Sequence, residues 1–144
     1  MTPEHVLFMC VANSARSQLA EGIARALAPD GVRISSAGSA PTRVRPEAVE
    51  VLMELGIDAS GQRSKSVDQI DVRTVDLVVT LCAEEVCPVL PGEMTRLHWP
   101  LPDPAQVEGS AEDRLESFRR TRDELSQRIA QLFAPSAHRG QKEP

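Results

Sequence analysis

One short segment of the sequence combines residue types that can bind and attack an oxyanion. It begins with Cys10 and has an arginine six residues later, followed directly by a serine. Successive backbone N–H groups in such a loop, together with the open N-terminus of a following helix, can form a cradle for an anion. The arginine can close the cradle by donating two parallel hydrogen bonds. We therefore predict an anion-binding loop made of Val11, Ala12, Asn13, Ser14, Ala15, Arg16 and Ser17.

Cys10 stands at the base of this predicted loop, where a nucleophile would meet the bound anion. Hydrogen-bond donors that bind an oxyanion also stabilise a thiolate, which is the form of cysteine that attacks. Ser17 can donate one more hydrogen bond to the sulfur. The alternative for Cys10 is a small buried residue at a strand end, with Arg16 on the surface.

The chain has three cysteines, and an odd number cannot pair completely within one molecule. This count argues against a secreted disulfide framework and leaves redox chemistry, a metal site or burial in the core. Cys82 follows an apolar run, so it is expected, like Cys10, at the carboxyl end of a strand. Ligands of α/β sheets bind beyond these strand ends. Cys87 follows Cys82 after four residues.

The elements that must position these residues alternate between strands and helices. Strands are predicted at residues 5–10, 32–37, 75–81 and 95–99. Helices are predicted over 19–27, over 46–55 and from a cap at Ser110 to residue 132, with one short helix within 58–74 and no regular structure over 100–104. This alternation predicts an α/β sandwich with right-handed crossovers. The arginines of the last helix, Arg119, Arg120 and Arg122, are expected on a solvated face.

Composition narrows the class of protein. With 144 residues and a net charge of −5, the chain is predicted to be one soluble domain over 1–134 with a disordered tail over 135–144. Acidic charge and only three phenylalanines and one tryptophan argue against a nucleic-acid surface. The longest apolar run, Val6–Ala12, is far shorter than the roughly 20 residues of a membrane helix. We expect a cytoplasmic protein that binds neither nucleic acid nor membranes.

Four segments resemble motifs of the thioredoxin-coupled arsenate reductases, a branch of the low-molecular-weight protein tyrosine phosphatase superfamily. In family order, they are Cys10-Val-Ala-Asn-Ser-Ala-Arg-Ser-Gln-Leu-Ala-Glu21, Ser35-Ser-Ala-Gly38, Asp76-Leu-Val-Val-Thr-Leu-Cys82 and His98-Trp-Pro-Leu-Pro-Asp-Pro104. The resemblance extends from Val6 to about Phe133. It implies a three-layer α/β sandwich with a four-stranded parallel sheet in the order 2-1-3-4. It also implies an enzyme that reduces arsenate to arsenite.

The resemblance further implies a role for each candidate residue. The residue that matches Cys10 attacks arsenate, and the one that matches Cys82 attacks the Cys10 sulfur and releases arsenite. A third cysteine, for which this chain offers only Cys87, collects the disulfide, which thioredoxin then reduces as an external reductant. The residue that matches Asp103 protonates the leaving oxygen, whereas an Asp-Pro pair without the resemblance indicates turn chemistry. No bound cofactor is expected, and phosphate and sulfate are expected to compete with arsenate.

Three departures from the family pattern bear on this interpretation. The family usually has six residues between the last two cysteines, so with four residues here Cys87 is either the final thiol, with a different loop conformation, or a bystander. Ala12 stands where the family commonly has glycine, so Asn13 is expected to take the left-handed conformation of the turn. Some members bind potassium through residues that match Asn13, Glu21 and Ser36 and an acidic residue where this chain has Lys65. We therefore predict no metal site.

Two other functions remain as alternatives. A phosphatase would need only Cys10, Arg16 and Asp103 to form and hydrolyse a phosphocysteine. Cys82 would then be surplus, and the chain lacks tyrosine, so that only Trp99 is placed to flank a phenyl phosphate. The third function is a regulator that binds zinc or arsenite through three thiolates and His98, but the chain lacks paired CxxC spacing.

Overall fold

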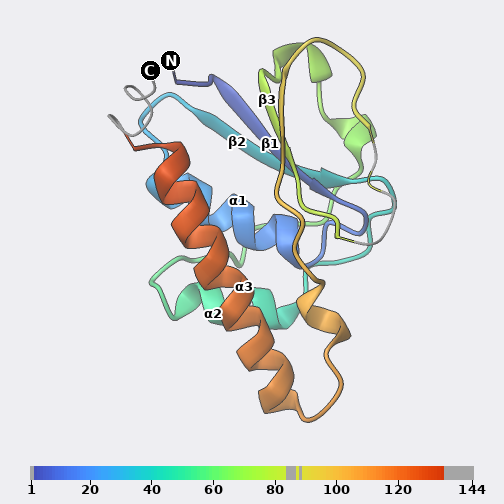
Figure 1. Ribbon diagram of the computed structural model, residues 1–144, viewed down its shortest axis with the longest axis vertical. Coiled ribbons are helices and arrows are strands. Elements are labelled where there is room, and N and C mark those ends of the chain that lie inside the picture. The colour runs from blue at the N-terminus through green and yellow to red at the C-terminus, as the bar shows by residue number, and fades with distance from the viewer. Residues whose placement is uncertain (1, 84–86, 88, 135–144) are drawn as a thin grey trace.

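Four parallel strands form a single sheet in the order β2-β1-β3-β4 (Figure 1). The computed structural model describes residues 2–83, 87 and 89–134. The strands are β1 (His5–Cys10), β2 (Arg33–Gly38), β3 (Leu77–Thr80) and β4 (Thr95–His98). Their order confirms the predicted fold class, and their ends differ from the predicted ones by at most two residues. The predicted disordered tail lies outside the described residues.

The central strand β1 brings two of the cysteines to the same edge of the sheet. All six of its residues are buried, which explains the uninterrupted apolar run in the sequence. Its register places Cys10 opposite Gly38 and Met9 opposite Thr80. Because the strands are parallel, the carboxyl ends of β1 and β3 meet at one edge, where Cys82 follows β3 after Leu81.

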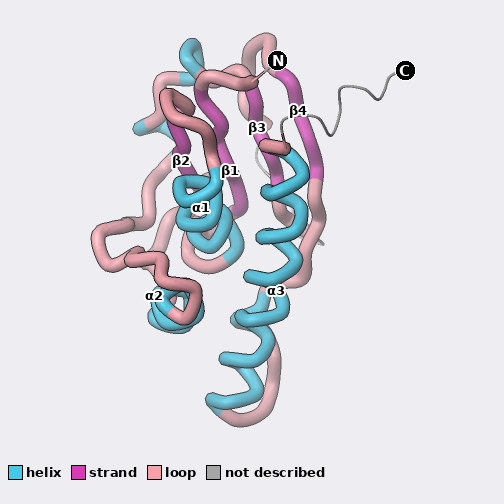
Figure 2. The backbone as a smooth tube through the Cα atoms, turned by 90° about the vertical axis from the view of Figure 1, so that its left-hand side faces the viewer, coloured by secondary structure: helices cyan, strands magenta, loops and turns pink. Residues whose placement is uncertain are grey.

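Three α-helices pack on one side of the sheet. α1 (Arg16–Leu27) and α3 (Ala111–Leu132) cover the sheet face, and α2 (Pro46–Met53) packs against both of them (Figure 2). Proline at the first position of α2 needs no hydrogen-bond partner for its nitrogen. The predicted cap of α3 is present, because Ser110 and Asp113 form a reciprocal capping box.

The opposite face of the sheet is covered by short turns and loops. Val67–Gln69 (η1) and Val72–Thr74 (η2) are 3₁₀ helices, which replace the one short helix predicted there. Their apolar side chains pack with Leu90 and Met94 over the inner strands. A third 3₁₀ helix, Pro104–Gln106 (η3), begins where no regular structure was predicted, because its proline can start a helical turn.

Two arginines of the α3 cluster, Arg119 and Arg122, contact residues at the end of α2. The prediction that the cluster lies on a solvated face is therefore wrong for these two. Arg122 is buried and donates hydrogen bonds to the carbonyl of Val51 at 2.9 Å and to Glu54 at 2.7 Å. Arg119 also binds Glu54, at 2.8 Å. Hydrogen bonds from both arginines lower the pKa of Glu54 to about 2. The pair therefore joins α2 to α3, whereas Arg120 is exposed as predicted.

Within the described ranges, no helix is both long and apolar enough to cross a membrane.

His5, at the start of β1, is a buried histidine with a hydroxyl group near each ring nitrogen. Its Nδ1 lies 2.9 Å from the Thr74 hydroxyl, and its Nε2 lies 2.8 Å from the Ser35 hydroxyl. The Thr74 hydroxyl donates to the carbonyl of Asp71, so Nδ1 is the donor to Thr74, and in the neutral ring Nε2 accepts from Ser35. Burial, reinforced by the nearby charge of Arg33, lowers the pKa of His5.

This lowered pKa predicts a pH-dependent stability. Just below the ordinary value of 6.5, the unfolded chain binds a proton at His5 that the folded chain does not. The free energy of unfolding therefore rises with pH across that window and falls as the pH drops below 6.5. We expect His5→Gln to flatten this part of the profile in urea denaturation on either side of pH 6.5. An unchanged profile in the variant would contradict the assignment.

Candidate active site

Cys10 is a free, buried thiol at the end of β1, in contact with the start of α1. Its sulfur lies 2.9 Å from the Ser17 hydroxyl. That hydroxyl accepts a hydrogen bond from Nδ2 of Asn13 at 2.7 Å, which leaves its own hydrogen for the sulfur. The sulfur of Cys10 is therefore held in a hydrogen-bonded chain with Ser17 and Asn13.

Asn13 has the left-handed conformation predicted for it, with φ of 49°. Its side chain is fully buried, and both the nitrogen and the oxygen of its amide form hydrogen bonds. Nδ2 donates to the hydroxyls of Ser17 and Ser36, and Oδ1 accepts from the backbone N–H of Lys65 at 2.8 Å and from Gln18 at 3.0 Å. The turn is therefore fixed by one amide that uses all of its polar atoms.

The carbonyl groups of the loop point outward, where neighbouring segments bind them. The backbone N–H groups of the next loop supply three hydrogen bonds of 2.9–3.1 Å, from Ala40 to Val11, from Thr42 to Ala12 and from Arg45 to Ser14. By contrast, the backbone N–H groups of residues 12–15 donate to no described residue. An oxyanion cradle at this loop, which would use these N–H groups, stays a prediction.

Gln18 and Gln62 support the loop and were missed in the sequence analysis. Gln18 is fully buried and donates to the backbone carbonyls of Asn13 and Arg63, at 3.1 and 2.9 Å. Gln62 in turn donates to the Gln18 side chain at 2.7 Å. The position of Gln18 beside the apolar stripe of α1 was a signal that it could be buried. The contact between Gln18 and Gln62 has no such signal, because the two residues are 44 positions apart in the sequence.

Arg16 contacts two further segments that border the site. Its guanidinium is buried, and Nη1 donates to the carbonyl of Leu101 at 2.9 Å and to that of Leu81 at 3.4 Å. Leu81 precedes Cys82, and Leu101 is two residues before Asp103. Arg16 therefore ties the base of the loop to both segments. Sequence analysis missed this contact, because backbone carbonyl acceptors have no side-chain signature.

Cys82 and Cys87 form a disulfide with a Cα–Cα distance of 5.6 Å, which is within the usual range for such bridges. The loop of four residues is therefore long enough for the two cysteines to pair. Cys82 is 1% exposed, whereas Cys87 is partly exposed to solvent. The bridge thus has one sulfur in the protein interior and one near the surface.

Asp103 lies at the start of η3, in the segment that Arg16 holds through Leu101. Its Oδ1 accepts a hydrogen bond from the backbone N–H of Ala105 at 3.0 Å, so the carboxylate caps the turn. The side chain is only partly buried. The turn chemistry predicted for an Asp-Pro pair is therefore present, whereas the role of Asp103 as an acid stays a prediction.

A buried carboxylate lies behind the loop, next to a lysine. Glu21 is 2% exposed, and its carboxylate lies 3.4 Å from Nζ of Lys65 and 2.7 Å from Arg25. The Ser36 hydroxyl donates to Glu21 and accepts from Asn13, which connects this cluster to the loop. Burial lowers the pKa of Lys65, although Glu21 opposes the shift. In the part of the chain that the structure describes, no three histidine, cysteine or acidic side chains are grouped to hold a metal ion.

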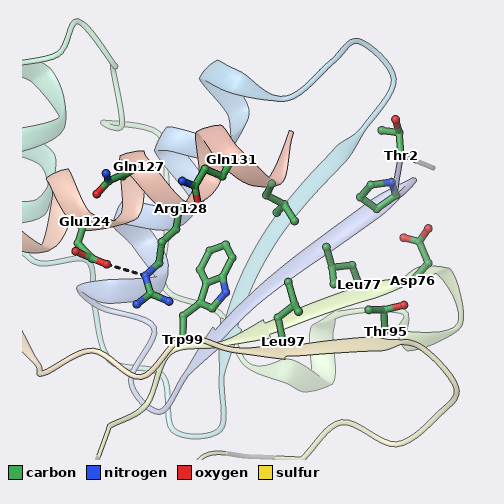
Figure 3. Close-up of a pocket in the computed structure, with 12 residues that line it drawn as sticks. Thr2, Asp76, Leu77, Thr95, Leu97, Trp99, Glu124, Gln127, Arg128 and Gln131 are labelled. Atoms are coloured by element: carbon green, nitrogen blue, oxygen red, sulfur yellow. Dashed lines mark hydrogen bonds and ion pairs between the residues drawn. The ribbon is translucent and has the colours of Figure 1, made fainter. Parts of the chain in front are cut away.

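Trp99 lines a separate groove of about 830 Å³ between α3 and the strands β3 and β4 (Figure 3). The guanidinium of Arg128 lies 5.8 Å from the centre of its ring and is held by Glu124. Neither the loop of residues 10–17 nor Asp103 borders this groove. The structure thus places Trp99 in this groove, not in the position predicted for flanking a phenyl group at the cradle.

Known proteins share both the sequence and the fold. The sequence profile described as low molecular weight phosphotyrosine protein phosphatase matches residues 5–142. An arsenate reductase of Halalkalibacterium halodurans is 44% identical over 131 residues, which cover 90% of this chain and 94% of that protein.

Solved structures add to this similarity. An arsenate reductase from Archaeoglobus fulgidus superimposes with a TM-score of 0.77 at 31% identity, covering 89% of this chain and 98% of that one. A thioredoxin-dependent arsenate reductase of Corynebacterium glutamicum has a TM-score of 0.61 at 32% identity, covering 89% of this chain and 62% of that one.

Gly38 is predicted to be essential for the shape of the loop. A Cβ atom at this position would lie 2.3 Å from the carbonyl oxygen of Val11 and 2.8 Å from that of Cys10. Because backbone atoms must move to relieve this overlap, we expect Gly38→Ala to lower the free energy of unfolding by about 1–3 kcal/mol. It should also weaken phosphate binding in calorimetry. Gly61→Ala is the matched control, since a Cβ there meets no atom within 4 Å.

If both glycine variants bind phosphate like the wild type, the close approach of Gly38 does not shape the cradle.

Lys65 is predicted to stabilise the buried carboxylate of Glu21 in place of an inorganic cation. Lys65→Met keeps the aliphatic chain and removes the charge, although Arg25 still neutralises part of Glu21. We expect a loss of about 1–3 kcal/mol in the free energy of unfolding, measured by denaturation. Arg43→Met, at an exposed position, serves as the control. Wild-type stability should be the same in potassium and sodium chloride, and a stabilisation specific to potassium would contradict this role of Lys65.

Proposed function

The chain belongs to the low molecular weight phosphotyrosine protein phosphatase family, and from this premise we propose that it reduces arsenate to arsenite through a disulfide relay recycled by thioredoxin. One observation carries the proposal: Cys82 and Cys87 are joined by a disulfide, whereas Cys10 is a free thiol. A relative with 44% identity is named an arsenate reductase, which supports this reaction. The similar Corynebacterium protein is described as thioredoxin-dependent, which supports this reductant.

In the first step, the Cys10 thiolate attacks arsenate. The backbone N–H groups of residues 12–15 and the guanidinium of Arg16 bind the anion, and Ser17 donates to the sulfur before attack. A sulfur–arsenic bond forms, and one arsenate oxygen leaves as water after Asp103 donates a proton to it. Arsenic remains pentavalent in this adduct.

In the second step, the Cys82 thiolate attacks the Cys10 sulfur. The sulfur–arsenic bond breaks, and its electron pair stays on arsenic, which becomes trivalent and leaves as arsenite. The two steps together convert H₃AsO₄ and two thiols into H₃AsO₃, one disulfide and one water. Arg16 assists by holding the carbonyl of Leu81, next to Cys82.

In the third step, the Cys87 thiolate attacks Cys82 and releases Cys10 as a thiolate. The product has the pairing seen in the structure. Because Cys87 is the more exposed sulfur, it is the one that an external dithiol can attack. Both electrons come from thiols, so the proposal requires no bound cofactor. It requires a reducing compartment such as the cytoplasm.

The alternative, hydrolysis of phosphate esters, uses the same cradle and the carboxyl of Asp103. It leaves the disulfide without a role, and it has no aromatic wall from Trp99, which lines another groove. Residues 1–134 are proposed to act as a single reductase domain.

A comparison of two activities tests the proposal. Arsenite production with a thioredoxin system is measured beside hydrolysis of an aryl phosphate, for the wild type and for Cys82→Ser. We expect Cys82→Ser to lose multiple-turnover arsenate reduction, because nothing can attack the Cys10 sulfur from within the chain, while any hydrolysis persists. Full arsenate turnover by this variant would overturn the relay. Cys10→Ser, which should lose both activities, controls for uncatalysed reaction.

The role of Cys87 has its own test. After one turnover without thioredoxin, mass mapping is expected to find a bridge between Cys82 and Cys87, with Cys10 open to alkylation. A bridge found only between Cys10 and Cys82 would show that an external thiol resolves the first disulfide directly.

A further inference from the structure

The strand β4 lies at the edge of the sheet and has β3 as its one neighbour among the described strands (Figure 2). The backbone N–H groups of Thr95 and Trp99 donate to carbonyls in and next to β3, at 3.0 and 2.8 Å. Successive residues of a strand direct their backbone groups to opposite sides, so those of Arg96 and His98 point away from the sheet. They form no backbone hydrogen bond with any described residue. This edge can therefore accept another strand.

An apolar groove lies directly beside the open edge. Leu97 and Trp99 form part of its floor, and both side chains are half-buried (Figure 3). The opposite wall is the end of α3, where Glu124 and Arg128 form an ion pair of 2.8 Å beside uncharged glutamines. This wall has no net charge, although the whole chain carries −5. A second molecule can approach it without charge repulsion.

We propose that the edge and the groove together form a dimer interface, in which β4 of a second copy pairs antiparallel with β4 around a two-fold axis at Leu97. In this register Arg96 lies opposite the partner's His98, and the same pair recurs on the other side of the axis. Both residues direct their N–H and C=O groups outward, so each pair exchanges both of its hydrogen bonds. The two sheets then form one continuous sheet.

Two residues of the chain select this register over its neighbours. A pairing centred on Arg96 places two arginines directly opposite each other, which is unfavourable. A pairing centred on His98 places Arg96 opposite Pro100, which has no N–H group to donate. A shift by a single residue opposes Arg96 to Leu97, whose backbone groups face β3. The pairing centred on Leu97 is the one that satisfies the backbone of both copies.

The side chains on the groove side also match their own copies. Leu97 lies opposite the partner's Leu97, and Thr95 lies opposite the partner's Trp99. These are pairs without mutual backbone hydrogen bonds, in which side chains approach most closely, and an aromatic side chain beside a β-branched one is favourable. The same surface thus fits itself across a two-fold axis, as the interface of a symmetric dimer must. This self-complementarity favours a second copy over an unrelated strand.

The dimer leaves both candidate active sites in place. Because the paired strands are antiparallel, the carboxyl ends of the two sets of strands point in opposite directions. Cys10 and Cys82 lie at these ends, away from the two-fold axis. The inference therefore does not depend on the proposed function.

The mass of the full chain in solution tests the proposal. Trp99 is the single tryptophan, so its fluorescence reports on the same surface. In analytical ultracentrifugation we expect a mass of twice 15.7 kDa at high concentration. On dilution, the mass should fall to that of the monomer and the Trp99 emission should shift to the red with the same midpoint. A monomer at every concentration, as expected if another segment or a different protein covers the edge, would overturn the proposal. Dissociation without a change in Trp99 emission would also overturn it.

Variants of His98 test the register. His98→Glu places a carboxylate opposite the partner's Arg96 and should tighten the dimer, whereas His98→Lys places like charges opposite each other and should weaken it. Because the pair occurs twice, we expect each change in the dimer dissociation constant to be about two- to thirtyfold. His98 is exposed, and circular dichroism checks that both variants fold.

Arg120→Gln is the matched control, since it changes the net charge as His98→Glu does, at an exposed position that does not line the groove. It should leave the dissociation constant unchanged. Changes of the same sign in both His98 variants, or a tightening by Arg120→Gln equal to that by His98→Glu, would overturn the proposed interface.

Discussion

The buried side-chain amide of Asn13 is the interaction on which the site depends. It holds its own backbone in a left-handed turn and binds Ser17, Ser36, Gln18 and the backbone of Lys65 at once. The carbonyls of the same loop accept hydrogen bonds from the segment of residues 40–45. The bond from Asn13 also orients the Ser17 hydroxyl toward Cys10. One polar group therefore connects the turn of the loop to the hydroxyl that contacts Cys10.

The second constraint is the parallel sheet, which brings the ends of distant strands together. β1 ends in Cys10, and the chain after β3 begins with Leu81 and Cys82, so the nucleophile and the resolving thiol meet at one edge. Arg16 reinforces this edge through the carbonyls of Leu81 and Leu101. A relay of thiols needs this proximity, because each step is an attack of one sulfur on another.

Much of the fold was predictable, because buried parallel strands leave continuous apolar runs and helices leave stripes. The motif around Cys10 and the left-handed turn at Asn13 were also predictable, because both depend on residues that are neighbours in the sequence. Arg122 was misjudged as solvated because its partners, Val51 and Glu54, are about 70 residues away. The contact between Gln18 and Gln62 was missed for the same reason, because the two residues are far apart in the sequence.

The sequence by itself determined the nucleophilic loop, the order of the elements and the number of thiols, all of which follow from local residue types and spacing. Only the tertiary structure decided that Cys82 and Cys87 pair across a short loop. It also decided that Arg16 binds two backbone carbonyls and that Trp99 lines a groove apart from the cradle. These outcomes depend on the packing of segments far apart in the chain, and the partners in such contacts, often backbone atoms, leave no pattern in the residues.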